Sequence, residues 1–223
     1  MAKLEDVKFI WRNADVVTFD VDSTVIQEEG IDELAKFCGK GDQVTALTSQ
    51  AMQGNLTFQQ SLTERLNIIK PSYTQVKQFL ESHPPKLTPG IKALVTALQA
   101  HKKQVFLVSG GFHCVIAPVA VLLDIPLEHV FANKLKFYFT GEYAGFDENQ
   151  PTAASGGKAK VIEYLKKELG CKTVVHIGDG ATDLETISIA DTFIGYGGNV
   201  VRESVKIGAP WFITDFNELA NAL

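Results

Sequence analysis

VVTFDVDSTVI, residues 16–26, is an apolar run that stops at two aspartates, Asp20 and Asp22, and continues into Ser-Thr. A short apolar run bounded by polar residues is typical of a strand that is buried on both faces of a parallel sheet. Side chains two residues apart on an extended segment point in the same direction. We therefore predict that Asp20 and Asp22 face one site at the end of a central strand.

Runs of the same kind recur along the chain and predict its fold class. They are QVFLVSGG (104–111), TVVHIGDG (173–180), TFIGYGG (192–198) and WFIT (211–214). Helical patterns precede two of them, at residues 90–102 and 157–170. This alternation favours an α/β fold with a Rossmann-like parallel sheet. A hairpin is predicted in LKFYFTGEYAGF (135–146), with Thr140-Gly141 at its turn, as a peripheral addition to the core.

Residues 28–83 differ from the rest of the chain, because their apolar residues have helical spacing and no strand-like run occurs among them. The segment ends at HPPKLTPG (83–90), where prolines disfavour helix and mark a boundary. We therefore expect a helical insertion at residues 28–83 and an α/β core made of residues 1–27 and 84–223.

The composition of the 223 residues, with 45% hydrophobic and 21% charged, is that of an ordinary globular protein. The net charge of -5 provides no broad positive field for nucleic acid or for an anionic membrane, so an anionic ligand would need local cations. Cys38, Cys114 and Cys171 lie far apart without a CxxC pair, which argues against a disulfide framework or structural zinc and favours the reducing cytoplasm. We expect no signal peptide and no membrane span, because no uninterrupted apolar run approaches the required length.

Ligands of open parallel sheets bind at the carboxyl ends of the strands, where several predicted strands here end in polar residues. These residues are Asp20 and Asp22, then Ser109, Gly110 and Gly111, then Asp179 and Asp183. Asp179 and Asp183 would share a face if a helix began after Gly180. Carboxylates gathered in one cavity would raise one another's pKa values unless a cation lay among them, and oxygen ligands without His or Cys favour Mg²⁺.

Each of these features also has a simpler interpretation. A single Asp at a strand end is commonly a helix cap or a turn residue, and Ser109-Gly110-Gly111 could be a tight turn into a helix. The same Ser-Gly-Gly, however, offers a hydroxyl and free N–H groups to a phosphate. Lys158 in SGGKAK would by default be solvated, yet a positive charge at a helix start opposes the helix dipole and suggests a nearby anion. The coincidence of carboxylates at successive strand ends favours a site.

In order and spacing, DVDST (20–24), Ser109, Lys158 and GDGATD (178–183) resemble the four motifs of the haloacid dehalogenase superfamily. The resemblance covers most of the chain and implies the fold of that superfamily, with the helical insertion as a cap after the first motif strand. It is stronger still for the members that hydrolyse phosphoserine. The stretches that carry it are EEGIDELA (28–35), LTERL (62–66), LVSGGF (107–112), FANKLKFYFTGEYAGFDE (131–148) and GGKAKVI (156–162).

The resemblance implies a chemical role for each motif. Asp20 would be the nucleophile that forms an aspartyl-phosphate, and Asp22 would protonate the leaving oxygen and then activate the water that hydrolyses the intermediate. Mg²⁺ would be held by Asp20, the backbone carbonyl of Asp22, and Asp179, while Asp183 would support these ligands and pair with Lys158. The residues that would contact the phosphoryl group are Lys158, Ser109, Gly110, Gly111 and Thr182.

Substrate choice is implied to lie in the cap. There Glu29 would meet the amine of phosphoserine and Arg65 its carboxylate, with Met52 lining the pocket. Taken alone, Glu29 is an ordinary acid at a helix start and Arg65 a solvated arginine. His176, inside a buried-strand pattern, is interpreted as a core residue rather than a ligand.

Together these expectations describe a Mg²⁺-dependent phosphatase that converts the small molecule O-phospho-L-serine to L-serine and inorganic phosphate, the final step of serine biosynthesis. The resemblance also hints at a homodimer. Two alternatives remain open. A different phosphatase or a phosphotransferase on the same scaffold would differ in its cap residues, and a non-catalytic module that binds phosphorylated ligands would need no nucleophile.

Overall fold

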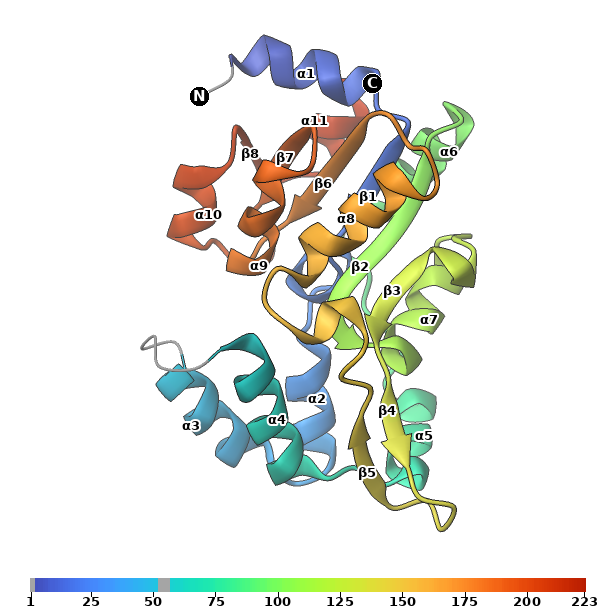
Figure 1. Ribbon diagram of the computed structural model, residues 1–223, viewed down its shortest axis with the longest axis vertical. Helices are drawn as coiled ribbons and strands as arrows, with labels where there is room; N and C mark the ends of the chain where they lie inside the picture. Colours follow the sequence, from blue (N-terminus) through green and yellow to red (C-terminus); the bar gives the residue numbers. More distant parts are fainter. Residues whose placement is uncertain (1–2, 52–56) are drawn as a thin grey trace.

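The computed structural model describes residues 3–51 and 57–223, and its centre is a parallel sheet with the strand order β3-β2-β1-β6-β7-β8 (Figure 1). The strands are β1 (Val16–Phe19), β2 (Gln104–Phe112), β3 (Val130–Asn133), β6 (Val174–Gly178), β7 (Thr192–Tyr196) and β8 (Trp211–Ile213). From β1 the chain adds β2 and β3 on one side, and then returns to the other side of β1 for β6, β7 and β8. The direction therefore reverses between β1 and β6, and such a reversal opens a crevice at the carboxyl ends of the two strands.

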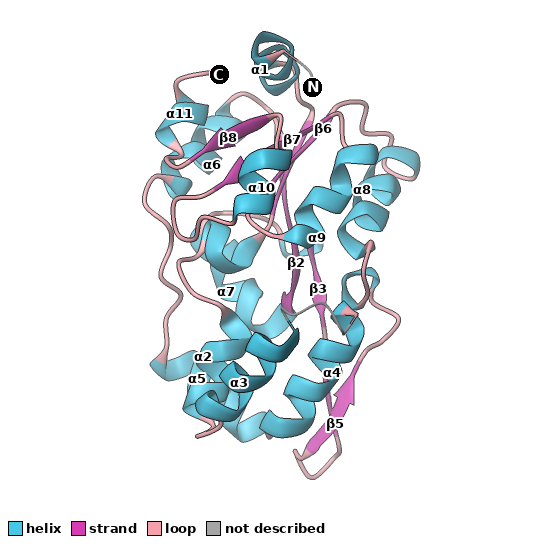
Figure 2. Cartoon of the chain, turned by 90° about the vertical axis from the view of Figure 1, so that its left-hand side faces the viewer, coloured by secondary structure: helices cyan, strands magenta, loops and turns pink. Residues whose placement is uncertain are grey.

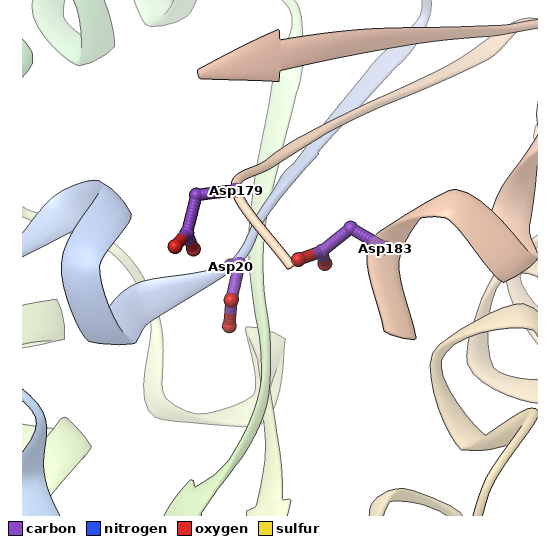
Figure 3. Close-up of side chains that lie close together, drawn as sticks. All are labelled: Asp20, Asp179 and Asp183. Carbon is purple, nitrogen blue, oxygen red and sulfur yellow. The ribbon is translucent and has the colours of Figure 1, made fainter. Parts of the chain in front are cut away.

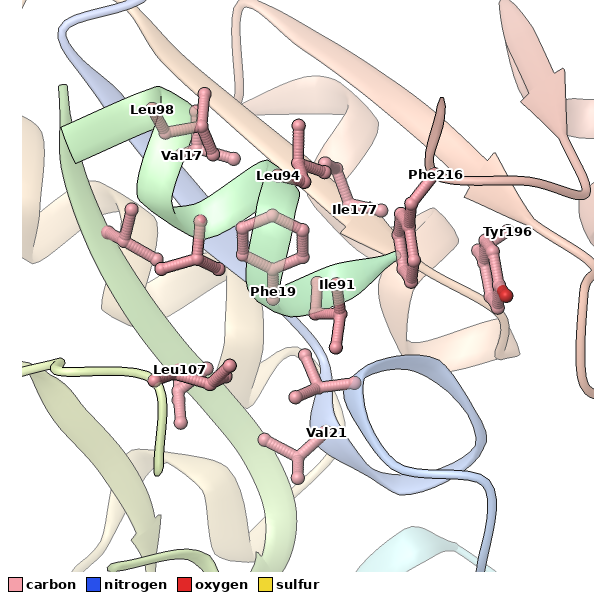
Figure 4. Close-up of a cluster of buried hydrophobic side chains, with 14 of the residues drawn as sticks. Val17, Phe19, Val21, Ile91, Leu94, Leu98, Leu107, Ile177, Tyr196 and Phe216 are labelled. Carbon is pink, nitrogen blue, oxygen red and sulfur yellow. The ribbon is translucent and has the colours of Figure 1, made fainter. Parts of the chain in front are cut away.

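Helices cover both faces of the sheet. One face carries α1 (Leu4–Arg12), α6 (Ile91–Ala100), α7 (His113–Leu122) and α11 (Asn217–Ala220), and the other carries α8 (Gly157–Lys167), α9 (Ala181–Leu184) and α10 (Glu203–Gly208). Successive strand residues point to opposite faces and both sets are apolar here. Phe19 lies in one apolar cluster with Leu94 of α6 (Figure 4), whereas Val16 lies in another with Val161 of α8.

The α/β class and parallel sheet predicted from the sequence are confirmed, and the predicted runs correspond to β1, β2, β6, β7 and β8. Strand β3 was not predicted. It is the run VFAN at one edge of the sheet, and two of its four residues, Ala132 and Asn133, are of types that are depleted in strands.

The predicted hairpin is also confirmed, as β4 (Leu135–Phe137) paired antiparallel with β5 (Tyr143–Phe146). Gly141 has a φ of +90° in its turn, a value that glycine adopts without strain. The prediction that the hairpin is peripheral is wrong. Phe146 is buried, and Phe137 packs with it against an apolar cluster formed mainly by helices. The hairpin is therefore part of a second core.

That second core belongs to α2 (Gly30–Phe37), α3 (Gly41–Ala51), α4 (Phe58–Ile69) and α5 (Tyr73–Ser82), which lie beyond the carboxyl ends of the strands in both views (Figures 1 and 2). Two chain segments connect these helices to the sheet and run side by side. Ile26 forms an antiparallel bridge with Leu87, and the N–H of Gln27 donates to the carbonyl of Lys86 at 3.0 Å. The helices are thus placed over the crevice between β1 and β6.

Short helical turns complete the described chain: η1 (Val21–Val25), η2 (Leu127–His129), η3 (Pro151–Ala153) and η4 (Glu185–Ser188). The turn η1 follows β1 directly, and Ser23 within it has a φ of +55°, in the left-handed region. Among the helices of residues 3–51 and 57–223, none combines the length and the apolar character needed to cross a membrane.

Candidate active site

The candidate active site lies in the crevice at the carboxyl ends of β1 and β6. Asp20 follows β1, Asp179 follows β6, and Asp183 lies on α9, so that three carboxyl groups converge on one space (Figure 3). One oxygen of each carboxyl group lies within 4.8 Å of those of the other two, and all three side chains are buried. Helix α9 begins at Ala181, as the spacing of Asp179 and Asp183 predicted.

Lys158, near the start of α8, supplies positive charge to this cluster. Its Nζ lies 2.8 Å from Asp20 Oδ1 and 2.7 Å from Asp183 Oδ1. Burial opposes the charge of Lys158, but Asp183 and Asp20 together raise the pKa of its ammonium group above the ordinary value. The default interpretation as a solvated lysine is therefore wrong, and the anions that its position suggested are these two carboxylates.

The three carboxyl groups are not equally well compensated. Burial and then repulsion by Asp183 raise the pKa of Asp20 well above its ordinary value, although Lys158 opposes this. Burial and Asp183 also raise the pKa of Asp179. Burial opposes the ionisation of Asp183 as well, but Lys158 and His176 hold the pKa of that carboxyl well below its usual range. The pKa values of Asp20 and Asp179 thus stay raised although Lys158 and Arg202 lie beside them, and their oxygen donors fit a hard divalent cation such as Mg²⁺.

The carboxylate of Asp22 turns away from this cluster. Its Oδ1 accepts a hydrogen bond from the N–H of Gly30 at 2.7 Å, and its Oδ2 accepts one from the hydroxyl of Ser109 at 3.3 Å. Burial, followed by repulsion from Glu29, raises the pKa of Asp22 to about 7. Asp22 can therefore take up or release a proton near neutral pH.

The glycines after Ser109 leave no space for a side chain. A Cβ on Gly111 would lie 2.7 Å from Asp22 Oδ2, and one on Gly110 would lie 2.6 Å from the ring of Phe58 on α4. Ser109 is fully buried, and its hydroxyl oxygen accepts a hydrogen bond from the N–H of Gly111 at 2.9 Å. Two bare glycines therefore let α4 and Asp22 approach the end of β2 closely.

A pocket of about 140 Å³ opens above these groups, between the sheet and the helices beyond it. Its lining residues are Asp20, Asp22, Glu29, Ile31, Phe58, Leu62, Arg65, Gly110, Gly111, Phe112, Lys158, Asp179, Gly180, Thr182 and Arg202. Most of the residues expected at the site are thus brought to one cavity. Ser109 does not line the pocket, but its hydroxyl donates to Asp22, which does. Met52 lies outside the described residues.

Glu29 and Arg65 give the pocket wall one anionic and one cationic group. Glu29 accepts a hydrogen bond from the hydroxyl of Ser23 at 2.7 Å, and Arg65 donates through Nε to the carbonyl of Ser61 on its own helix at 3.3 Å. Burial lowers the pKa of Arg65, while Asp32 and Glu29 oppose this shift. Arg65 is thus not a freely solvated arginine, and its guanidinium lies among acidic groups.

Sequence reasoning missed Arg202, which lines the pocket just before α10. Its Nε lies 2.9 Å from Asp179 Oδ2 and its Nη2 lies 3.2 Å from Glu29 Oε1, so it joins the sheet side of the pocket to the helical side. No motif marks Arg202 in the sequence. Thr24, which the DVDST motif includes, donates through its hydroxyl to Asp179 Oδ1 at 3.1 Å. The last residue of DVDST therefore orients the aspartate that follows β6.

Comparisons with known proteins agree on one family. A family model described as haloacid dehalogenase-like hydrolase matches residues 14–191. The chain is 58% identical over 223 residues to the phosphoserine phosphatase of Bos taurus, in an alignment that covers 100% of this chain and 99% of that protein.

The fold of the chain is also similar to those of solved structures. The chain resembles the structure of DsGPDH of Dunaliella salina with a TM-score of 0.88 and 34% identity, over 100% of this chain and 38% of that one. It resembles a phospho-aspartyl intermediate analogue of phosphoserine phosphatase with a TM-score of 0.81 and 26% identity, over 94% of this chain and 99% of that one.

Proposed function

Because the chain belongs to the haloacid dehalogenase-like hydrolase family, we propose that it hydrolyses O-phospho-L-serine to L-serine and inorganic phosphate. The similarity to the Bos taurus phosphoserine phosphatase along the whole chain supports this substrate. The observation that carries the proposal is the pocket, in which a buried Asp20 shares one cavity with Glu29 and Arg65. A nucleophile, an anion and a cation there correspond to the phosphate, the amine and the carboxylate of phosphoserine.

In the first step, a carboxylate oxygen of Asp20 attacks phosphorus and forms an aspartyl-phosphate while the bond from phosphorus to the serine oxygen breaks. Asp22, with its pKa raised to about 7, gives its proton to that leaving oxygen. Lys158, which lies 2.8 Å from Asp20, and the N–H of Gly110 stabilise the charge on the phosphoryl oxygens. The N–H of Gly111 donates to the Ser109 hydroxyl in this structure and would have to leave it to join them. Thr182, on the pocket wall, adds a hydrogen bond.

In the second step, the Asp22 carboxylate takes a proton from water, and the resulting hydroxide attacks the phosphorus of the aspartyl-phosphate. The bond from phosphorus to Asp20 breaks, which restores the nucleophile and releases phosphate. One residue therefore serves as acid and then as base. The hydrogen bonds from Gly30 and Ser109 hold the Asp22 carboxyl in place for both transfers.

The chemistry also needs a cation, since Asp20 and the phosphate are both anionic. Asp20, the backbone carbonyl of Asp22, and Asp179 would hold Mg²⁺, which would neutralise charge so that nucleophile and phosphate can approach. Asp183 would stay outside this set, because its carboxylate has three partners, with Lys158 and His176 on Oδ1 and the N–H of Gly180 on Oδ2. Asp179 has one partner on each oxygen, Thr24 and Arg202.

Four further assignments accompany the function. Residues 28–83 form a cap domain over a core of residues 1–27 and 84–223, which the apolar cluster of α2 to α5 supports, although Phe112 and Phe146 of the core also join that cluster. A cytoplasmic location suits the free thiols of Cys38, Cys114 and Cys171. The enzyme completes serine biosynthesis. It assembles as a homodimer, and sedimentation analysis of the purified chain would test this oligomeric state.

One experiment tests the function: phosphate release from a panel of phosphorylated amino acids, sugars and nucleotides, with and without Mg²⁺. We expect phosphoserine to be the best substrate, no turnover without the metal, and no turnover by Asp20→Asn. A preference for a sugar phosphate or a nucleotide would refute the substrate. Full activity of Asp20→Asn would refute the nucleophile, and absence of phosphate release from every ester would favour a binding module.

A further inference from the structure

A line of buried polar side chains continues from the active site into the sheet. Asp183 Oδ1, which accepts from Lys158 Nζ at 2.7 Å, also lies 2.7 Å from His176 Nε2. On the other side of the ring, His176 Nδ1 lies 2.7 Å from Thr18 Oγ1. Thr18, His176 and Asp183 are all fully buried. A histidine that the sequence marked as core thus contacts the anion that pairs with Lys158.

The register of the sheet builds this line. Thr18 on β1 is the direct partner of His176 on the neighbouring β6. Val16 and Val174, two residues earlier on each strand, belong to the apolar cluster beneath α8. The Thr18 and His176 side chains therefore leave the sheet on the face that α8 covers, which is the helix that carries Lys158.

The direction of each hydrogen bond follows from the chemistry of the groups. An ionised carboxylate only accepts hydrogen bonds, so the hydrogen facing Asp183 is carried by His176 Nε2. Burial lowers the pKa of His176 and favours its neutral ring, so Nδ1 is an acceptor and the Thr18 hydroxyl donates to it. The other acceptor near that hydroxyl, the carbonyl of Val175, is farther away, at 3.4 Å. Thr18 thus selects the tautomer of His176 that can donate to Asp183.

We propose that Thr18 and His176 are positioning residues, which orient Asp183 so that it anchors Lys158 against Asp20. The inference rests on the proposed function, which assigns Lys158 and Asp20 to the reaction. Two donors on Asp183 Oδ1, with the N–H of Gly180 on Oδ2 at 2.9 Å, prevent rotation of the carboxylate. Lys158 therefore has a fixed anchor while charge moves from Asp20 to the phosphoryl group.

Matched substitutions test this inference. His176→Leu removes the donor at similar volume, whereas His176→Gln keeps an N–H at the end of the side chain. We expect kcat for phosphoserine to fall about 10- to 100-fold in His176→Leu, the range found when a partner behind a catalytic ligand is lost. KM should change little, and His176→Gln should recover most of the loss. Thr18→Val should lower kcat in the same direction, and Thr18→Ser should restore it.

A control separates positioning from stability. Ile177→Val, on the opposite face of β6, should lower the melting temperature without changing kcat, because it removes only a buried methyl group. An unchanged kcat in a folded His176→Leu would overturn the inference. So would an equal loss in His176→Gln and His176→Leu at equal melting temperatures, since the ring and not the donor would then matter.

A direct readout comes from nitrogen NMR of the full chain with labelled histidine, assigned through His176→Gln. We expect the hydrogen of the His176 ring on Nε2, and a ring with its hydrogen on Nδ1 alone would overturn the inference. If the protein hydrolyses p-nitrophenyl phosphate but not phosphoserine, only the proposed substrate is refuted. The same comparison of variants on that ester would still test the anchor.

Discussion

At the scale of residues, the surroundings of Asp20 and Asp22 separate their chemistry, although only one residue lies between them. Burial and Asp183 raise the pKa of Asp20, but Lys158 at 2.8 Å opposes this shift and favours the carboxylate that a nucleophile needs. Asp22 has no such close cation among its hydrogen-bond partners in the described structure, and burial raises its pKa to about 7. The division of labour between nucleophile and proton carrier therefore follows from local contacts.

The proton role of Asp22 predicts a burst in the Asp22→Asn variant. With p-nitrophenyl phosphate, whose leaving group needs no proton, we expect release of about one nitrophenol per active site and then near arrest, because no base activates water for the second step. Rapid-quench kinetics and acid-stable labelling of the protein would measure it. Steady turnover at the unmutated rate would contradict the role. Asp20→Asn should give no burst at all.

The pocket wall predicts a selective defect in Arg65→Ala. The loss of a hydrogen bond to the substrate carboxylate, worth roughly 1.5–3 kcal/mol, should lower kcat/KM for phosphoserine about 10- to 100-fold. Hydrolysis of p-nitrophenyl phosphate, which has no carboxylate, should be nearly unchanged. Glu64→Ala, the exposed neighbour on α4, is the control and should affect neither. Equal losses on both esters would contradict the contact with the substrate carboxylate.

The site residues that the sequence could identify lie at strand ends, where a polar side chain directly follows an apolar run. Asp20, Asp179 and the Ser-Gly-Gly near the end of β2 were all found in this way. Arg202 could not be found, because it reaches Asp179 only through the packing of β7 beside β6 and of α10 after it. For the same reason the role of His176 depended on a strand register that one chain segment does not reveal.

At the scale of elements, helices α4 and α5 begin with the same capping motif but differ in whether they contribute residues to the pocket. Thr57 caps α4 by accepting from the N–H of Gln60, and Ser72 caps α5 by accepting from the N–H of Gln75. In both helices, the side-chain oxygen of that glutamine accepts a hydrogen bond from the backbone N–H of the capping residue. Only α4 of the two contributes to the described wall of the pocket, through Phe58, Leu62 and Arg65.

The two caps therefore predict a matched pair of variants. Thr57→Ala and Ser72→Ala should each lower the free energy of unfolding by about 1 kcal/mol. Only Thr57→Ala should also raise KM for phosphoserine, because fraying of the first turn of α4 moves the Phe58 ring away from Gly110. Urea unfolding and steady-state kinetics on both variants would measure this. A similar rise of KM in Ser72→Ala would show that general loosening of the helices is responsible.

The elements also show where prediction from sequence ends. Short apolar runs bounded by glycine or aspartate identified the central strands, because burial on both faces leaves a strong pattern. The edge strand β3 left no such pattern, because Ala132 and Asn133 in its run VFAN are of types depleted in strands. The hairpin was found by its turn, but its packing against Tyr73 of α5 is a tertiary contact. The sequence of an aromatic-rich hairpin has the same pattern whether the hairpin is buried or exposed.

At the scale of the whole molecule, the fold brings more negative than positive charge to the crevice. The strand reversal places Asp20 beside Asp179, and α9 adds Asp183, while Lys158 and Arg202 are the basic residues bonded to these carboxylates in the described structure. Repulsion among buried carboxylates destabilises the folded chain. A bound cation would relieve it, so metal binding at this site would be linked to folding stability.

This linkage predicts that Mg²⁺ stabilises the folded chain even without substrate. At a free concentration one hundred times its Kd, the ion should add about 2.7 kcal/mol, which corresponds to roughly 5–11 °C in melting temperature for a domain of this size. Removal of the ion with EDTA should reverse the shift. In Asp179→Asn the melting temperature without metal should rise or hold, since a repelling charge is lost, while the shift with Mg²⁺ should nearly vanish. Asp147→Asn, in the hairpin region, should keep the full shift, and an undiminished shift in Asp179→Asn would place the ion elsewhere.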